Sequence, residues 1–115
     1  MAVFTQAQLE AIAAALGHTE EGLRGPEIEL LLRTARMADV SPGVTKRHRI
    51  YNAFAESQNA RQDRTHILAF IRFAMKPERY LTAPERFEPM RRNLNRALLF
   101  AGLTVEEDGK LAEVA

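Results

Sequence analysis

The sequence predicts an all-α domain, a compact bundle of about five helices that ends in a short C-terminal β-hairpin. Three observations support this prediction. Apolar residues recur at helical spacing in several segments that Gly and Pro separate. Thr, Asp or Pro precedes most of these segments, as expected at helix starts. Asp108-Gly109, between two short apolar stretches, predicts a hairpin over about 103–114. With 115 residues, the chain fits one domain, 1–115.

The first two helices have clear start signals. Thr5 to Gln8 matches a capping box, so we place the first helix at about 6–16 and end it at Gly17. Pro26 suits the first turn of a helix because its missing N–H would have no partner there. An apolar stripe at i, i+3, i+4 and i+7 then predicts a second helix over roughly 26–37.

The third and fourth helices form the middle of the chain. Thr45 is the expected N-cap of a helix at about 46–59. Asp63 is the expected cap of a helix at about 64–76, which the following proline ends. This fourth helix has almost no polar face, and a helix that is apolar nearly all round is a buried one. We therefore expect it at the centre of the core.

The last helix has two prolines near its start. Thr82 to Glu85 matches a capping box with an early proline, but Pro89 would clash inside a continuing helix. We therefore expect a single turn at 83–87 and a separate long helix at about 89–101. Gly102 is its expected C-terminal cap.

No catalytic constellation emerges from the residue types. The chain has no cysteine, which excludes disulfides, thiolate metal sites and Cys nucleophiles. The glycines are isolated and form no phosphate loop, and the histidines lack metal-ligand spacing; they are His18, His48 and His66. We expect no catalytic residue, no cofactor and no metal. No apolar run is long enough to span a membrane and no secretory signal is present, so we expect a cytoplasmic protein without a membrane partner.

Charge is unevenly distributed along the chain. Segment 46–96 holds twelve Lys/Arg against five Asp/Glu, whereas the remainder holds four against ten, for a net charge of +1. A basic middle between acidic ends predicts a surface that captures an acidic partner. The alternative is that these side chains simply solvate exposed helix faces. The candidate partner-binding residues are Lys46, Arg47, His48, Arg49, Arg61, Arg64, Arg91, Arg92 and Arg96.

One short pattern raises a ribonuclease interpretation. Arg61 and His66 have the Arg, four residues, His spacing of helical ribonucleases that resemble HEPN domains, and that family implies action on the RNA backbone across a dimer. The pattern here spans a predicted helix start instead of lying inside one helix. We therefore rank a HEPN-like ribonuclease fragment third among the functions considered.

A longer set of motifs resembles a known family. The sequence from about Leu23 to Leu111 looks like the N-terminal region of Ymh-like bacterial proteins associated with abortive infection. The motifs are Thr45–Phe54, Gln58-Asn59, His66, Ala69–Ile71, Ala74-Met75, Pro77–Tyr80, Pro84–Phe87, Leu94-Asn95, Phe100–Leu103 and Asp108–Lys110. Members of that family carry a further C-terminal HEPN-like domain. The resemblance thus implies an excised domain or a stand-alone version, to which no catalytic residue transfers.

Together these observations predict a non-catalytic recognition or adaptor module of a bacterial anti-phage defence protein. It would act by protein–protein interaction, docking an effector domain or partner protein, or by self-association into a homo-oligomer. The alternative is a nucleic-acid-binding helical domain that uses the basic middle segment to hold RNA or DNA.

Overall fold

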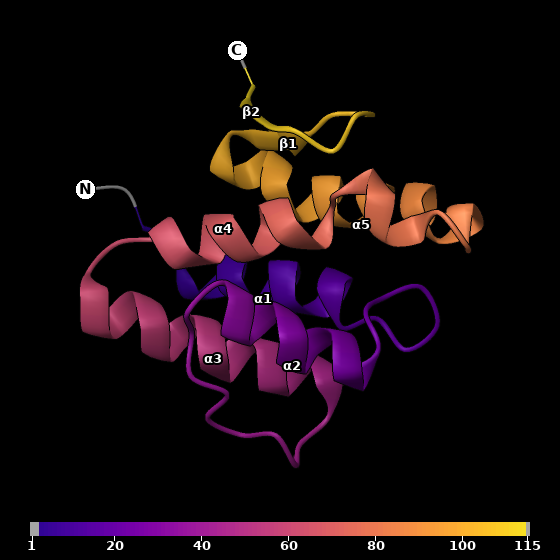
Figure 1. The fold of residues 1–115 in the computed structure, drawn as a ribbon. Helices are drawn as coiled ribbons and strands as arrows, with labels where there is room; N and C mark the ends of the chain where they lie inside the picture. Colours follow the sequence, from indigo (N-terminus) through magenta and orange to yellow (C-terminus); the bar gives the residue numbers. More distant parts are fainter. Residues whose placement is uncertain (1–2, 115) are drawn as a thin grey trace.

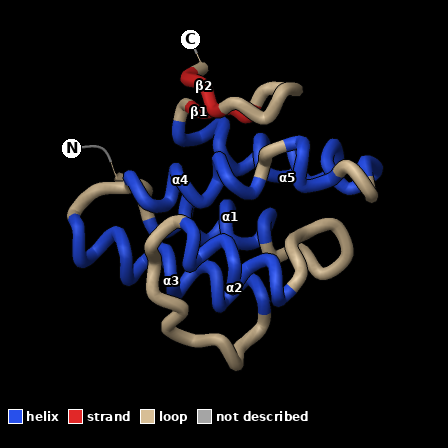
Figure 2. The backbone as a smooth tube through the Cα atoms, viewed as in Figure 1, coloured by secondary structure: helices blue, strands red, loops and turns tan. Residues whose placement is uncertain are grey.

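The computed structural model describes residues 3–114 and confirms the predicted fold class (Figure 1). Its helices and strands, coloured by type in Figure 2, are α1 (Gln6–Leu16), α2 (Gly25–Thr34), α3 (Lys46–Arg61), α4 (Thr65–Ala74), α5 (Phe87–Leu98), β1 (Leu103–Val105) and β2 (Leu111–Glu113). Three short 3₁₀ turns complete the chain: η1 (Pro77–Tyr80), η2 (Pro84–Arg86) and η3 (Leu99–Ala101).

The helices pack in two layers, with α5, α1 and α3 in one and α4 and α2 in the other. α1 contacts α3 on one side and α5 on the other, whereas α2 and α4 pack on each other and on α3 (Figure 1). The domain measures 37 × 35 × 21 Å, and its smallest dimension matches two helices about 10 Å thick each. The hairpin packs on α5 at one edge of the bundle. A layered arrangement of this kind leaves one side of α1 facing solvent.

The core is a single cluster of apolar side chains. α4 contributes as expected from its sequence, since only Thr65 and Arg72 of its ten residues are exposed. At the junction of α3 and α4, the rings of Phe54 and Phe70 meet edge to face with centroids 5.0 Å apart. This geometry suits the ring quadrupoles and fixes how the two helices are oriented.

The first helix begins and ends where the sequence predicts. The Gln8 backbone N–H donates to Thr5 Oγ1 at 3.1 Å, and the Thr5 N–H donates to Gln8 Oε1 at 2.9 Å. Gly17 follows the helix and is buried against the start of α3. A Cβ at this position would lie 2.6 Å from Arg47 N, closer than real contacts allow. Glycine is therefore needed here for the close approach of α1 to α3.

Two predicted helix ends are wrong by a few residues. α2 ends at Thr34 instead of 37, because Arg36 adopts a left-handed conformation with φ of 61°. α3 extends two residues past 59 to Arg61, where the left-handed Gln62 (φ of 59°) ends it. The sequence signal was weak in both places, since neither left-handed residue is a glycine.

Of the predicted caps of the middle helices, the position of Thr45 is confirmed and that of Asp63 is corrected. Thr45 occupies the N-cap position of α3, but its hydroxyl makes no capping bond and instead lies 2.8 Å from His48 Nδ1. The cap position of α4 is Arg64, and the helix spans 65–74 within the predicted 64–76. Asp63 still accepts a hydrogen bond from the Thr65 N–H at 3.1 Å. Its carboxylate therefore supplies a partner for a first-turn N–H of α4, from the position before the cap.

The expected break before the last helix does not occur. α5 begins at Phe87, directly after η2, so Pro89 lies within its first turn instead of starting it. A proline is tolerated there because the first backbone N–H groups of a helix have no intrahelical partner. The predicted turn at 83–87 is the 3₁₀ turn η2, and no side-chain capping bond from Thr82 forms. The helix itself ends at Leu98, and η3 continues it to Gly102, whose φ is +73°.

The C-terminal hairpin is confirmed. β1 and β2 are antiparallel, with Leu103 opposite Glu113 and Val105 opposite Leu111. Gly109 has a φ of +87°, as expected for the glycine of an Asp-Gly turn. Leu103 and Val105 are buried against the helices, which supplies the packing that an isolated hairpin lacks.

Candidate interaction surface

Lys46 does not present its charge to a partner. Its ammonium nitrogen donates to the backbone carbonyls of His18 at 3.0 Å and Leu23 at 2.8 Å, with a longer contact of 3.4 Å to Thr19. These carbonyls belong to the loop that joins α1 and α2. The residue therefore holds that loop to the start of α3, which is a structural role.

Arg49 is also engaged inside the domain. Its side chain is 10% exposed and forms a two-pronged ion pair with Asp39, with Nε 3.0 Å from Oδ1. A further bond joins its Nη1 to the Gly25 carbonyl at 3.3 Å. Such forked geometry gives strong, directional bonds. Arg49 therefore fixes the loop after α2 and the start of α2 against α3.

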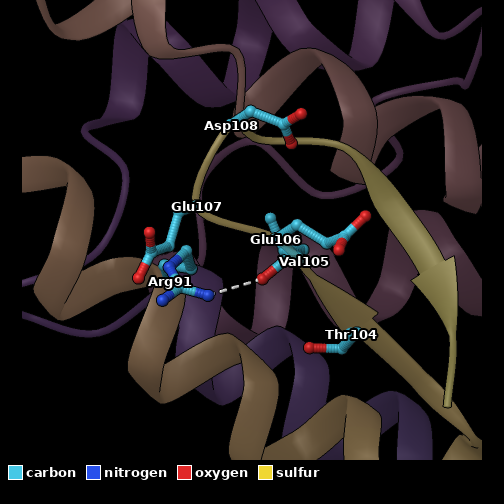
Figure 3. A pocket seen from close by; sticks show the side chains of 6 residues that line it. All are labelled: Arg91, Thr104, Val105, Glu106, Glu107 and Asp108. Atoms are coloured by element: carbon cyan, nitrogen blue, oxygen red, sulfur yellow. Dashed lines mark hydrogen bonds between the residues drawn. The ribbon is translucent and has the colours of Figure 1, made fainter.

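Arg91 lies beneath an acidic rim (Figure 3). Its guanidinium binds both carboxylate oxygens of Glu88, at 3.0 and 3.1 Å, and donates to the Val105 carbonyl at 2.7 Å. The hydrogen bonds from Arg91 hold the pKa of Glu88 below its usual value. The surrounding hollow, about 560 Å³ in volume, is also lined by Glu106, Glu107 and Asp108. Carboxylates around a single arginine repel a phosphate backbone, so this hollow does not suit a nucleic acid.

Two further arginines lie where α3 meets α4. Arg61 Nε is 3.5 Å from Asp63 Oδ1, and the Arg64 guanidinium lies 4.8 Å from the centroid of the Phe4 ring. The second contact is a cation–π interaction that covers the N-terminal segment. Gln58 anchors the same segment, since its side-chain amide bonds both the N–H and the carbonyl of Phe4.

The same junction bears on the ribonuclease pattern. Arg61 is the last residue of α3, whereas His66 lies in the first turn of α4, with the left-handed Gln62 between them. The two side chains therefore belong to different helices. Within residues 3–114, no group of His, Asp and Glu has the arrangement of a metal site.

The remaining basic residues lie on both sides of α1. Arg47 and His48 line a hollow between α1 and α3, together with Glu10. Arg92 and Arg96 are exposed on α5, and Arg96 lines a second hollow between α1 and α5. The helix α1 separates the two pairs. Of the nine predicted residues, Lys46, Arg49 and Arg91 are bonded internally, Arg61 pairs with Asp63 and Arg64 covers Phe4. The other four, Arg47, His48, Arg92 and Arg96, form no single basic strip.

Apolar side chains form much of the lining of the second hollow. Phe100 is 80% exposed, and the adjacent Leu99 is also exposed. The hollow has a volume of about 320 Å³ and is lined by Ala11, Ala14, Ala15, Asn93, Arg96, Ala97 and Phe100. Gln8 Nε2 donates to the Phe100 carbonyl at 3.0 Å, which fixes this end of η3 against α1. We call Phe100 and the three α1 alanines the α1–η3 face.

Sequence reasoning missed the α1–η3 face, although a signal for it exists. The core stripe of the last helix includes Leu94 and Leu98, and helical spacing from these positions places Leu99 and Phe100 outside that stripe. Of the three α1 alanines, Ala11 is exposed, Ala14 is partly buried and Ala15 is buried. Their small side chains make a shallow depression in which another chain can pack.

The comparisons with known proteins give no family for the chain. No helix within residues 3–114 is both long enough and apolar enough to cross a membrane. No family model matches the sequence, and neither a curated protein nor a solved structure does so.

Proposed function

We propose that the chain is a non-catalytic protein-interaction module whose contact surface is the α1–η3 face. The exposure of Phe100 is the observation that carries this proposal. A large aromatic ring in water beside another exposed apolar residue is energetically unfavourable, and such rings commonly anchor protein interfaces. The bacterial anti-phage setting rests on the resemblance to Ymh-like proteins.

The occupant that we propose for the α1–η3 face is a second copy of the chain. Each copy offers the exposed ring of Phe100 beside the shallow depression formed by the α1 alanines, so two copies can bury each other's apolar surface. An effector domain is the competing protein partner. Nucleic acid finds less support, because Lys46, Arg49 and Arg91 are bonded internally and α1 divides the exposed cations.

Self-association is tested by analytical ultracentrifugation over a concentration series that reaches the millimolar range. We expect the wild-type chain to dimerise and Phe100→Ser to weaken the dimer at least tenfold, because a buried aromatic anchor contributes on the order of 2 kcal/mol or more. Leu81→Ser is the matched control, since Leu81 is 78% exposed in the η1–η2 connection, outside this face. It should dimerise like the wild type.

Two results would contradict the proposal. A wild-type chain that stays monomeric at every concentration excludes the second copy as the occupant. Equal weakening by Phe100→Ser and Leu81→Ser would mean that association is non-specific. A parallel titration with RNA and duplex DNA near physiological salt should show no binding, and tight binding there would favour the nucleic-acid function instead.

A further inference from the structure

The hairpin has one covered edge and one open edge. Val114 N bonds Gly102 O, and Glu106 N bonds Lys110 O, so residues 104 and 112 form the hydrogen-bonded pair between them. Leu103, Val105, Leu111 and Glu113 therefore direct their backbone N–H and carbonyl groups away from the partner strand. These outward groups decide what each edge of the hairpin can bind.

The outer edge of β1 is covered by α5. Asn95 imitates a neighbouring strand at Val105: its Oδ1 accepts from the Val105 N–H at 2.7 Å, and its Nδ2 donates to the Val105 carbonyl at 3.0 Å. Arg91 donates to the same carbonyl at 2.7 Å (Figure 3). No extended segment can pair with this edge at Val105 unless α5 is displaced.

The outer edge of β2 has no such cover. Among the described residues, the outward N–H and carbonyl groups of Leu111 and Glu113 bond no other part of the chain. Figure 1 shows β2 on the outer side of the hairpin, with β1 nearer α5. An open strand edge is a template for main-chain pairing with another extended segment.

A groove lies along the start of this open edge. Its volume is about 420 Å³, and it is lined by Arg72, Lys76, Pro77, Glu78, Asp108, Gly109, Lys110 and Leu111. One wall is thus the hairpin, and the other is the end of α4 with η1. Leu111, which lines the groove, is half-buried and supplies its apolar surface.

The cations of the groove are available to a ligand. Arg72 is exposed and has no hydrogen bond or ion pair within residues 3–114, and Lys76 has only the ring of Phe73, 5.2 Å from its ammonium. Lys110 is exposed and lies 4.0 Å from Asp108, which is a weak contact. Three cations and two carboxylates line the groove, so its charge favours an acidic ligand.

We propose that the open edge of β2 and the adjacent groove bind an extended acidic segment of a partner protein by strand addition. Main-chain bonds to Leu111 and Glu113 would hold the segment in register. Its side chains on the helix side would alternate between apolar contact with Leu111 and carboxylate contact with Arg72 and Lys76. This surface is separate from the α1–η3 face and does not depend on it.

A second copy of β2 fits this edge poorly. Antiparallel pairing of two copies about Ala112 would place Leu111 opposite Glu113 of the other copy, which pairs an apolar side chain with a charge. Pairing about Glu113 would place the two glutamates opposite each other, which is repulsive. Pairing about Leu111 would require Gly109 to pair as a strand, although it lies in the turn.

The probe is a labelled, end-blocked hexapeptide, Thr-Thr-Val-Thr-Glu-Thr, which in antiparallel pairing places Val opposite Leu111, Glu at the cations of the groove and Thr opposite Glu113. Its counterpart carries lysine in place of glutamate. Fluorescence anisotropy with the full chain should show that the acidic peptide binds at least tenfold more tightly. Equal binding of the two peptides, or no binding of the acidic one, would overturn the proposal.

Two variants separate main-chain pairing from charge. Glu113→Pro removes one outward N–H and leaves the bonds between β1 and β2 intact, so it should weaken binding at least tenfold. The double variant Arg72→Glu with Lys76→Glu should do the same without touching the hairpin. Arg33→Glu, on the exposed side of α2, is the control and should bind like the wild type.

Further controls show whether a variant misfolds and whether the chain pairs with itself. Amide resonances of β1 must be unchanged in Glu113→Pro, and the charge-reversal pair tests the proposal independently of the hairpin. Peptide addition should shift the amide resonances of Leu111 and Glu113. Unchanged affinity in either variant would overturn strand addition in this groove, and so would dimerisation of the chain that excludes the peptide.

Discussion

Replacing Glu27 with glutamine should destabilise the domain by about 3 kcal/mol, the magnitude expected when one partner of a largely buried ion pair is removed. The Glu27 carboxylate accepts hydrogen bonds from Arg86 at 2.7 and 3.0 Å and from Arg79 at 3.3 Å. It also accepts from the Arg24 N–H at 2.8 Å. It thereby joins the first turn of α2 to the 3₁₀ turns η1 and η2.

The loss is large because two guanidinium groups would be left without an anion. The side chains of Glu27, Arg79 and Arg86 are only 17–20% exposed, so water replaces the carboxylate poorly. Both guanidiniums also lie over the buried ring of Tyr80, at 5.9 and 5.3 Å, and that ring keeps them in place. A glutamine in place of Glu27 can accept fewer of these bonds and carries no charge.

Urea unfolding at neutral pH measures this effect. Glu29→Gln is the matched control, because Glu29 lies on the same helix and its pair with Arg33 is exposed. We expect the control to change the free energy of unfolding by no more than about 0.5 kcal/mol. If the two variants have equal stability, the Glu27 cluster contributes nothing beyond an exposed ion pair.

The same cluster predicts a pH dependence. Burial by itself raises the Glu27 pKa, but hydrogen bonds from Arg86 and the Arg24 N–H, with the charges of Arg86 and Arg79, lower it below 4.5. A carboxyl group whose pKa is lower in the folded state stabilises the fold above its unfolded pKa, and this contribution is lost as pH falls through the folded pKa. The stability difference between wild type and Glu27→Gln should therefore shrink below about pH 4.5. A difference that is constant with pH would contradict the ionic role.

Replacing Gly109 with alanine should cost about 3 kcal/mol, from two separate causes. The φ of +87° is unfavourable for any residue with a Cβ. In addition, a Cβ would lie 2.3 Å from the Met75 carbonyl oxygen and 2.8 Å from Pro77 Cδ. The hairpin turn is seated directly on the end of α4, so the new atom forces the two apart.

Alanine variants of two other glycines measure the backbone cause and the steric cause separately. Gly102 has a φ of +73° but open space around its Cβ position, so Gly102→Ala should lose only the conformational part, about 1 kcal/mol. Gly43 has neither feature and its alanine variant should be within about 0.5 kcal/mol of wild type. Urea unfolding gives the three values, and amide hydrogen exchange shows whether β1 and β2 open in Gly109→Ala. Equal losses for Gly109→Ala and Gly102→Ala would mean that the turn moves freely away from α4.

Local rules predicted the elements because each rule acts over a few residues. The capping box at Thr5, the apolar stripes and the Asp108-Gly109 turn all lie within one helical or hairpin repeat. The misplaced ends share one cause. Arg36 and Gln62 take left-handed conformations without being glycine, and Pro89 is tolerated because α5 starts before it. Tertiary packing outweighs a weak local preference at such positions.

The sequence by itself determined the all-α class, the helix order, the buried character of α4 and the uneven charge. Only the tertiary structure decided which charges are free. Lys46 reaches Leu23, Arg49 pairs with Asp39 and Arg91 reaches Val105, contacts that no local spacing encodes. The exposed Phe100 and the open edge of β2 likewise depend on which elements pack beside them. Charge and hydropathy are properties of a residue, whereas availability to a partner is a property of its surroundings in three dimensions.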